Sequence, residues 1–364
     1  MGKHSILITS LSKTKPLKLL HFTQCQIATL VILYYFFQFY STAIQYWLEV
    51  VTLYSKSLGT LDVFTNARFK GNQVAIVEFG DTPLSPVQMH MIAQEFNFSE
   101  TVLLHQNNDG EIVVKIYTPQ NEMDFAGHPV IGTGHAIFGR LLPSLKDKKA
   151  SLTTHILTNA GPVELNYDPT TGFVTAEVPH NIRIHHHPTT LQQLLETQAG
   201  LKSHLSTMQP SFPAISIVKG VTYTLADLSS HPEIFMCLKP GPSQTTKLDD
   251  GWSPSFTGTM YYIKSSPYKE DDIIVQRLRV RMIAINLEDP ACGSGSCALS
   301  VYLALQQGGS GAKFRFLIEQ GKEIGRDSSI KVDVILNDQG TGVAHIFLAG
   351  QATPVMEGTL LLPN

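Results

Sequence analysis

Glu100, His128 and Asp289 are ionisable residues that could carry out acid–base chemistry in this chain. Glu100 follows the sequence NFS and lies between two apolar runs, where a carboxyl group partly removed from water would have a raised pKa. Such a group can exchange a proton near neutral pH. His128 and Asp289 each lie in a glycine-rich turn. A glutamate at a helix end or strand edge is also a common structural residue, so residue type alone does not decide the role of Glu100.

The two glycine-rich turns have corresponding features. FAGHP at 125–129 precedes the apolar run VIGTGHAIFGRLL, and DPACGSGSC at 289–297 precedes ALSVYLALQQ. If each run is a helix, its first turn has unpaired main-chain N–H groups and the positive end of the helix dipole. Glycine lets a ligand approach those groups, so two such starts facing one cleft would bind a substrate carboxylate. The glycines could equally serve close packing of the two elements.

The elements that must position these residues are short strands and helices, which begin near Leu61. Ser85 as N-cap and Pro86 at the first helical position predict a helix that ends shortly before Glu100. Alternation and β-branching predict strands at 61–65, 73–79, 111–117, 152–157, 162–166, 173–178, 214–226, 258–264, 273–283, 314–319, 330–335 and 343–348, with a further helix near 191–196.

The runs after the two turns are apolar on nearly every face, which predicts two buried central helices. This pairing indicates an α+β fold of two pseudo-symmetric domains with a cleft between them, each domain a mixed or antiparallel sheet wrapped around a central helix. We assign residues 59–170 plus 352–364 to the first domain and 171–351 to the second. Residues 1–58 form an N-terminal extension.

The composition excludes several classes of protein. A hydrophobic content of 43%, a charged content of 16% and a net charge of −3 fit a globular enzyme. No basic stripe is present, so nucleic acid is not an expected partner. The chain has 4 cysteines without paired CxxC spacing, which fits a reducing, cytoplasmic compartment and predicts neither a disulfide scaffold nor a zinc site. We expect Cys237 and Cys297 to be core residues.

Two further groups of residues have competing interpretations. The histidine run 185–187 has neither helical spacing nor nearby carboxylates, so no metal site is predicted there. Arg277, Arg279 and Arg281 alternate along a predicted strand and should share one face. That face could help to hold an acidic substrate, or its arginines could form structural pairs.

The N-terminal extension contains an apolar and aromatic segment at 27–48, long enough to span a bilayer as a helix. Four lysines precede it, so a signal-anchor with a cytoplasmic N-terminus is physically possible. A wrongly assigned first exon would give the same pattern. The expected location is therefore cytoplasmic, with membrane anchoring through 27–48 as the alternative.

Several motifs, in order along residues 60–364, resemble the PhzF-like family of phenazine biosynthesis-like isomerases, which has the diaminopimelate epimerase fold. The ordered set is more specific than any one motif. The motifs are FKGNQVAIV, EFNFSETV, IYTPQNEMDFAGHPVIGTGHA, EDPACGSGSCAL, IEQGKEIGR and AGQATPVMEG.

The resemblance implies roles for the residues at matching positions. Glu100 corresponds to the family's acid–base carboxylate, His128 to the histidine of its AGHP motif and Asp289 to the aspartate of its EDP motif. These are the predicted catalytic residues. The implied reaction is a proton-shift isomerisation of a small carboxylic acid from specialised metabolism, catalysed by a single acid–base residue. It needs no metal, flavin or pyridoxal phosphate, so no cofactor is predicted, and the implied assembly is a homodimer.

The substrate-binding set follows from the same comparison of motifs. Gly127 and Gly293 correspond to the family's substrate-binding glycines at the paired helix starts. Ser294 and Cys292 are the neighbours of Gly293 and complete the predicted set.

Cys292 leaves other functions open. The sequence ACGSGSCA resembles the thiol motif of true diaminopimelate epimerases, and a thiol at a helix start is expected to have a lowered pKa. A two-thiol racemase or epimerase would need a second thiol at Ala126, which has no ionisable group. A thiol hydrolase that uses Cys292 with His128 and Asp289 is a second alternative. A non-catalytic small-acid-binding or interaction protein is the third.

Overall fold

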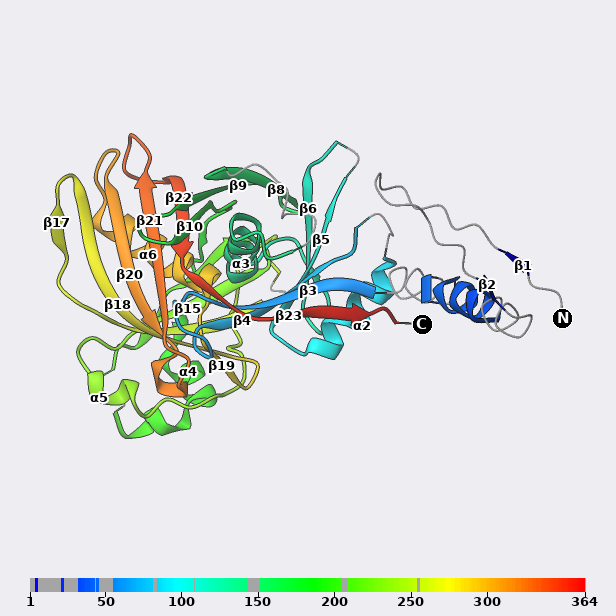
Figure 1. Ribbon diagram of the computed structural model, residues 1–364. Helices are drawn as coiled ribbons and strands as arrows, with labels where there is room; N and C mark the ends of the chain where they lie inside the picture. Colours follow the sequence, from blue (N-terminus) through cyan, green and yellow to red (C-terminus); the bar gives the residue numbers. More distant parts are fainter. Residues whose placement is uncertain are drawn as a thin grey trace. The chain divides into compact units, whose positions relative to one another are not determined.

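The computed structural model divides the chain into two units, Met1–Ser55 and Lys56–Asn364 (Figure 1). The structure describes residues 4–5, 21–22, 32–42, 44–45, 55–80, 84–107, 109–142, 151–204, 208–253 and 256–363. In the first unit, β1 (His4–Ser5) pairs with β2 (His21–Phe22), and residues 32–42 are helical. No helix within the described ranges is long and apolar enough to cross a membrane. The remaining residues of the predicted apolar segment 27–48 lie outside those ranges.

The first part of the second unit follows the predicted order of elements. These are β3 (Ser55–Val63), β4 (Asn72–Glu78), α2 (Pro86–Phe96), β5 (Glu100–Gln106), β6 (Ile112–Tyr117), β7 (Glu122–Met123), α3 (Gly127–Phe138), β8 (Thr153–Thr158), β9 (Gly161–Asp168) and β10 (Phe173–Glu177).

The second part repeats much of this order, with extra short elements before β14. Its elements are β11 (Arg183–Ile184), β12 (Thr189–Thr190), α4 (Leu191–Thr197), η2 (Ala199–His204), β13 (Ser211–Phe212), β14 (Ala214–Val218), β15 (Val221–Asp227), α5 (Pro232–Phe235), β16 (Phe256–Lys264), β17 (Tyr268–Glu270), β18 (Ile273–Ala284), β19 (Leu287–Asp289), α6 (Gly293–Gln307), β20 (Lys313–Gln320), η3 (Lys322–Ile324), β21 (Ser328–Leu336), β22 (Val343–Gly350) and β23 (Ala352–Leu361).

Hydrogen bonds join most strands of both parts into one series. Its order is β3-β4-β5-β6-β8-β9-β10-β22-β21-β20-β18-β16-β15-β14-β11. The two parts meet where β10 pairs antiparallel with β22. The division of the second unit at residue 171 stays a prediction.

The same arrangement of strands surrounds two helices. In the first part, α3 lies in the connection between the parallel strands β6 and β8; in the second, α6 lies between the parallel strands β18 and β20 (Figure 1). Each helix also follows a short strand that pairs antiparallel with the preceding one, β7 with β6 and β19 with β18. A parallel pair needs a crossover, and the apolar runs supply it in both parts. The predicted α+β fold with two sheet-wrapped helices is confirmed.

Both central helices are buried along most of their length, as their apolar composition predicts. Two glycines let the sheet pack directly on α3. A Cβ atom at Gly132 would lie 2.8 Å from Val74 Cγ1, and one at Gly134 would lie 2.6 Å from Val174 Cγ1. These distances are too short for nonbonded carbon atoms, so glycine is required for this packing.

The last strand, β23, was not predicted. It follows β22 after a single residue and lies along β3, where a Cβ atom at Gly59 would be 3.8 Å from the Met356 carbonyl oxygen. Its side chains are half-buried or exposed, so its sequence lacks the alternation on which strand prediction depends. This strand lies beside β3, while the predicted grouping of 352–364 with the first domain stays a prediction.

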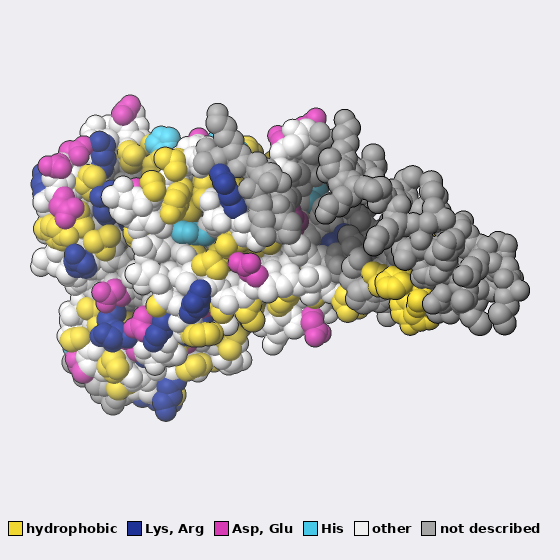
Figure 2. Space-filling view, viewed as in Figure 1, with side chains coloured by type: hydrophobic (Ala, Val, Ile, Leu, Met, Phe, Trp, Pro, Cys, Tyr) yellow, Lys and Arg dark blue, Asp and Glu magenta, His cyan; other side chains and the backbone are white. Residues whose placement is uncertain are grey.

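On the face shown in Figure 2, Lys and Arg side chains are interspersed with Asp and Glu side chains.

Of the two cysteines expected in the core, Cys297 is buried, but Cys237 is exposed, so the prediction for Cys237 was wrong. Cys237 is the second residue after the short helix α5, and its neighbour Met236 is also exposed.

Candidate active site

The beginnings of β5 and α3 and the end of β19 meet around the predicted catalytic residues. Glu100 is the first residue of β5, His128 the second of α3 and Asp289 the last of β19. Glu100 Oε2 lies 3.5 Å from His128 Nε2. The charge of Asp289 acts on the pKa of His128, and that of Glu100 acts on the pKa of Asp289. The structure therefore brings the three side chains together, while their catalytic roles stay predictions.

Local sequence signals fix the position of Glu100. Helix α2 begins with a capping box in which the Ser85 side chain accepts a hydrogen bond from the Gln88 main-chain N–H, and it ends at Asn97 with φ 50°. The chain then enters β5, which runs parallel to β4 from the pair Val74–Glu100. Since β5 also pairs with β6, Glu100 is held at the end of an interior strand.

Burial gives Glu100 and His128 unusual acidities. Desolvation raises the pKa of Glu100, in opposition to a hydrogen bond from the Ser99 side chain. It lowers the pKa of His128 to about 4, although the Asp289 charge and a hydrogen bond with the Gln73 main chain act in the other direction. In the described part of the chain, Glu100 Oε2 and His128 Nε2 are buried without a hydrogen-bond partner. The expected rise in the pKa of Glu100 is confirmed, and His128 is uncharged at neutral pH.

Asp289, which is half-buried, carries the second carboxyl group of the site. Burial raises its pKa to about 6, against the lowering effects of His128 and the Ala291 N–H, and the nearby Glu100 raises it further. The Ala291 N–H donates to Asp289 Oδ1 at 2.9 Å. Asp289 therefore titrates close to neutral pH and stabilises the turn that leads into α6.

Asn72 is a site residue that the sequence analysis missed. It is the first residue of β4, and its buried side-chain Nδ2 donates to Asp289 Oδ1 at 2.9 Å and to the Ala291 carbonyl oxygen at 3.0 Å. The same nitrogen lies 3.4 Å from His128 Nδ1. The signal for it was Gly71-Asn72 within the FKGNQVAIV motif: Gly71 has φ 65°, and the turn it forms directs Asn72 into the site.

The two helix starts touch each other at their glycines. A Cβ atom at Gly127 would lie 3.1 Å from Gly293 Cα and 2.8 Å from Leu348 Cδ2; one at Gly293 would lie 3.2 Å from Gly127 Cα. Close packing thus accounts for both glycines. Substrate binding by them stays a prediction.

These starts nevertheless leave free hydrogen-bond donors. Among the described residues, no acceptor is found for the main-chain N–H groups of Gly127, His128, Gly293 and Ser294. They are the first and second residues of their helices, where no intrahelical acceptor exists. Four donors and two positive dipole ends therefore lie where the helix starts meet, an arrangement suited to an anion.

Cys292 is the N-cap of α6, and its thiol is enclosed by protein groups. Its Sγ accepts a hydrogen bond from the Gly295 N–H at 3.4 Å and lies 3.3 Å from the Tyr223 hydroxyl. The Tyr223 hydroxyl also lies 2.7 Å from Ser294 Oγ. Burial, followed by the charge of Asp289, raises the pKa of the Cys292 thiol to about 12. The expectation of a lowered pKa was wrong, because burial and a neighbouring carboxylate outweigh the helix start.

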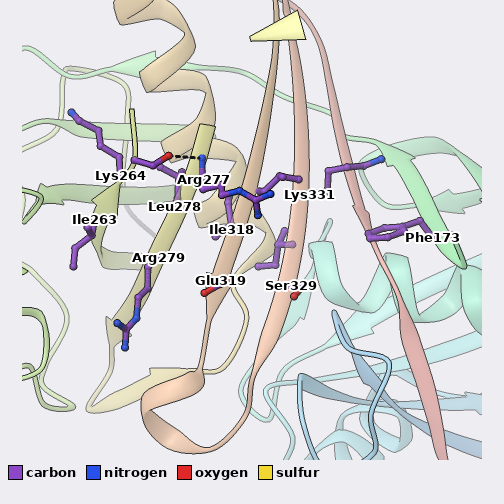
Figure 3. Close-up of a pocket in the computed structure, with 13 residues that line it drawn as sticks. Phe173, Ile263, Lys264, Arg277, Leu278, Arg279, Ile318, Glu319, Ser329 and Lys331 are labelled. Carbon is purple, nitrogen blue, oxygen red and sulfur yellow. Dashed lines mark hydrogen bonds between the residues drawn. The ribbon is translucent and has the colours of Figure 1, made fainter. Parts of the chain in front are cut away.

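Two of the three arginines of β18 form structural pairs. Arg281 forms a buried bidentate pair with Glu288, and Arg279 pairs with Glu323. Arg277 and Arg279 line a groove of about 520 Å³ across β16, β18, β20 and β21, where Lys331 extends toward Phe173 (Figure 3). None of the predicted catalytic residues lines this groove.

His185 has neighbours in the order of a catalytic triad but the opposite hydrogen-bond polarity. Its Nε2 lies 2.8 Å from the buried Ser216 Oγ, and its Nδ1 lies 3.8 Å from Asp249 Oδ2. However, Nδ1 accepts the Asp249 main-chain N–H at 3.2 Å, so the proton must be on Nε2. His185 then donates to Ser216 and cannot act as its base.

No group of three or more candidate metal ligands occurs in the part of the chain that the structure describes.

Comparison with protein families gives one match that covers most of the chain. Residues 61–358 match the family model described as "Phenazine biosynthesis-like protein". An uncharacterized isomerase of Mesorhizobium japonicum (mll1393) is 29% identical over 83% of this chain and 97% of its own length. The trans-2,3-dihydro-3-hydroxyanthranilate isomerase of Pseudomonas fluorescens is 44% identical over 78 residues, which are 21% of this chain and 28% of that protein.

Solved structures agree with the fold. A PhzF-family phenazine biosynthesis protein of Bacillus anthracis superposes with a TM-score of 0.62 at 20% identity, over 84% of this chain and 99% of the other. A hydroxyproline epimerase of Agrobacterium vitis superposes with a TM-score of 0.51 at 13% identity, over 84% and 91%. The predicted epimerase-like fold is thereby confirmed.

Proposed function

The chain belongs to the phenazine biosynthesis-like protein family, in which several curated relatives of this chain are named isomerases, and we propose that this isomerase moves a proton within a small carboxylic acid. Glu100 is the proposed proton carrier, and His128 and Asp289 are the proposed supporting groups.

The observation that carries the proposal is a set of unsatisfied polar groups at one place. Glu100 Oε2 and His128 Nε2 are buried without hydrogen-bond partners among the described residues, although buried polar atoms are rarely left in this state. The four N–H groups of the two helix starts lie at the same junction. A bound carboxylic acid would supply acceptors for the N–H groups and a reacting carbon or heteroatom opposite Glu100 and His128.

The proposed reaction uses one residue in two roles. With the substrate carboxylate on the helix N–H groups, Glu100 accepts a proton from one carbon, and the electron pair moves into the conjugated system of the substrate. Glu100 then returns the proton to a different carbon, so the atoms and the oxidation state of the substrate are unchanged. Burial makes the Glu100 carboxylate a stronger base than a solvated glutamate.

His128 and Asp289 suit supporting roles in this reaction. His128 is neutral because its pKa is about 4, so it can hydrogen-bond a substrate heteroatom without adding a positive charge. Asp289, with a pKa of about 6, can adjust its charge as the substrate binds. Both groups are fixed in place before reaction, which is the condition for electrostatic stabilisation of a transition state.

Thiol chemistry is less well supported. In the described part of the chain, the hydrogen-bonding neighbours of Cys292 Sγ are Tyr223, Ser294, Gly295 and Asp289, none of which is a histidine base. A thiol with a pKa of about 12 is not ionised at neutral pH. At the corresponding helix start Ala126 is the N-cap, so a second thiol is lacking for racemisation.

The proposal includes cofactor independence and a homodimer, both implied by the resemblance described above. Dialysis against chelator, followed by the same assay, tests the first. Light scattering on the purified chain tests the second, with twice the mass of 40.1 kDa as the expected result.

The decisive experiment follows the reaction by NMR in deuterated buffer with the full-length chain. The first substrate to use is trans-2,3-dihydro-3-hydroxyanthranilate, because a curated relative is named for it. Wild type and Glu100→Gln are compared, with Glu111→Gln as a surface control. Turnover by wild type and the control alone supports the proposal. Equal turnover by all three would refute the role of Glu100. Binding of small acids without turnover of any would favour the non-catalytic alternative.

A further inference from the structure

We infer that Asn72 is a positioning residue that orients the Asp289 carboxylate against His128, and that it thereby joins the contributions of the two parts of the site. This inference deepens the proposed function and rests on it. Asn72 belongs to β4 in the first part, whereas its hydrogen-bond acceptors, Asp289 and Ala291, belong to the turn before α6 in the second. Its side chain is only 3% exposed.

The hydrogen bonds of Asn72 fix which way its amide points. Nδ2 carries two hydrogens, and these are donated to Asp289 Oδ1 at 2.9 Å and to the Ala291 carbonyl at 3.0 Å. Both partners accept, so a flipped amide would bring oxygen against oxygen. The amide nitrogen therefore has no hydrogen left for His128 Nδ1, which lies 3.4 Å away.

His128 is thus left to hydrogen-bond with the next residue of the same strand. A hydrogen bond with the main chain of Gln73 raises the pKa of His128, as expected when a carbonyl accepts a ring N–H. Because Nε2 has no partner among the described residues, the donor is Nδ1–H. The lone pair of Nε2 then faces Glu100 Oε2, at 3.5 Å. Adjacent residues of β4 accordingly orient both supporting groups, Asn72 acting on Asp289 and Gln73 on His128.

The hydrogen bond from Asn72 affects the titration of Asp289. Groups from every neighbouring element act on this carboxyl: His128 of α3 and the Ala291 N–H favour its charged form, as does a hydrogen bond with the Cys292 side chain, while Glu100 of β5 and burial oppose it. The phenol of Tyr223 on β15 is also coupled to its charge. A neutral donor at Oδ1 stabilises the ionised form, so we expect its removal to raise the pKa of Asp289.

Gln320 supplies a matched control. Its buried amide binds the same turn, donating to the Asp289 carbonyl at 2.7 Å and accepting the Cys292 N–H at 3.2 Å. It contacts the main chain of the turn and no carboxyl group in these bonds. Loss of Gln320 therefore removes support from the turn without removing the donor to Asp289 Oδ1.

The test titrates the Asp289 carboxyl carbon directly, by NMR of the full-length chain carrying ¹³C-labelled aspartate, with Asp289→Asn to assign the signal. We expect the nearly isosteric Asn72→Leu to raise the pKa by about one unit or more, and Gln320→Leu to leave it within a few tenths. If Asn72→Leu does not fold by circular dichroism, Asn72→Ala is titrated instead. An unchanged pKa in the Asn72 variant, or an equal shift in Gln320→Leu, would overturn the inference.

This readout needs no substrate, so it separates the inference from the proposed function. A titration shift without turnover of any acid would leave Asn72 as the positioning residue and refute the proposed reaction alone.

Discussion

The two parts of the second unit build the same arrangement of strands around α3 and α6 but place different chemistry at equivalent points. Glu100 begins β5 and Phe256 begins β16, each at the start of a parallel pairing. The N-caps of α3 and α6 are Ala126 and Cys292, and the second helical residues are His128 and Ser294. The fold is repeated, whereas the ionisable groups are not.

This difference favours a division of labour over a symmetric mechanism. A racemase that removes a proton on one side and adds one on the other needs equivalent bases at both helix starts. Here the first part supplies the Glu100 carboxyl and the His128 imidazole, and the second supplies the Asp289 carboxyl and the Ser294 hydroxyl. A proton that leaves and returns through one residue is consistent with this asymmetry.

The largest expected effect on activity comes from replacing Glu100, which has no ionisable counterpart in the second part. Glu100→Gln should lower kcat/KM by about 10²- to 10⁴-fold, because the amide cannot accept or return a proton. Glu111→Gln, at an exposed position, should change it little. Steady-state kinetics on both variants makes the measurement. Similar rates for the two would mean that the first part does not supply the base.

A second prediction concerns the stability cost of Asp289. Its pKa is about 6 in the folded protein against 3.8 for the free group, so the folded state binds more protons between these values. The contribution of this group to stability is thus complete below pH 3.8 and lost as the pH rises through 6. The free energy of unfolding of Asp289→Asn, taken relative to that of wild type, should therefore be larger at pH 8 than at pH 4. The expected increase is about 2–3 kcal/mol.

Urea unfolding of both proteins at several pH values measures this difference. His128, with a pKa of about 4, also contributes to the pH dependence of stability in the acidic range. Asp327→Asn is the control. Lys70 lowers the pKa of Asp327, so removing the Asp327 carboxylate should destabilise the protein more at high pH than at low pH, which is the opposite pH dependence. A pH-independent difference between wild type and Asp289→Asn would contradict the prediction.

A third prediction tests the contact between the helix starts. Gly127→Ala should reduce the free energy of unfolding by about 1–3 kcal/mol, since its Cβ would lie 2.8 Å from Leu348 Cδ2 and 3.1 Å from Gly293 Cα. Gly358→Ala is the matched control, because nothing lies within 4 Å of its Cβ position. Chemical denaturation compares them, and equal stabilities would show that the helix starts are not in close contact.

The smallest expected effect makes the two N-caps identical. Cys292→Ala should reduce kcat/KM by less than about tenfold, because the thiol is protonated and serves to accept the Gly295 N–H and to hydrogen-bond Asp289. Kinetics and iodoacetamide sensitivity are the measurements. A loss as large as that of Glu100→Gln would restore the thiol-dependent alternatives.

The fold could be predicted because its signals are local. The capping box at Ser85, the apolar runs after the two turns and the alternation in most strands are properties of short segments, and the structure confirms them. Strand β23 was missed because half-exposed side chains on both faces produce no alternation. Its position depends on its neighbours in space.

The site was predictable in part for a related reason. Glu100, His128 and Asp289 stood out by residue type and by their turns, and the structure places them together. The bond from Asn72 to Asp289 joins residues 217 positions apart, which periodicity does not reveal. The acidity of Cys292 was predicted in the wrong direction because the sequence shows a helix start but not the depth of burial.

The return of β23 to the first part has a consequence for biosynthesis. Phe64 N–H donates to the Gln351 carbonyl at 2.7 Å, and Arg68 Nε donates to the Pro354 carbonyl at 2.8 Å. The edge of β3 therefore receives its neighbour only after residues 351–361 have been synthesised. Until those residues leave the ribosome, this edge stays unpaired and available to other strands.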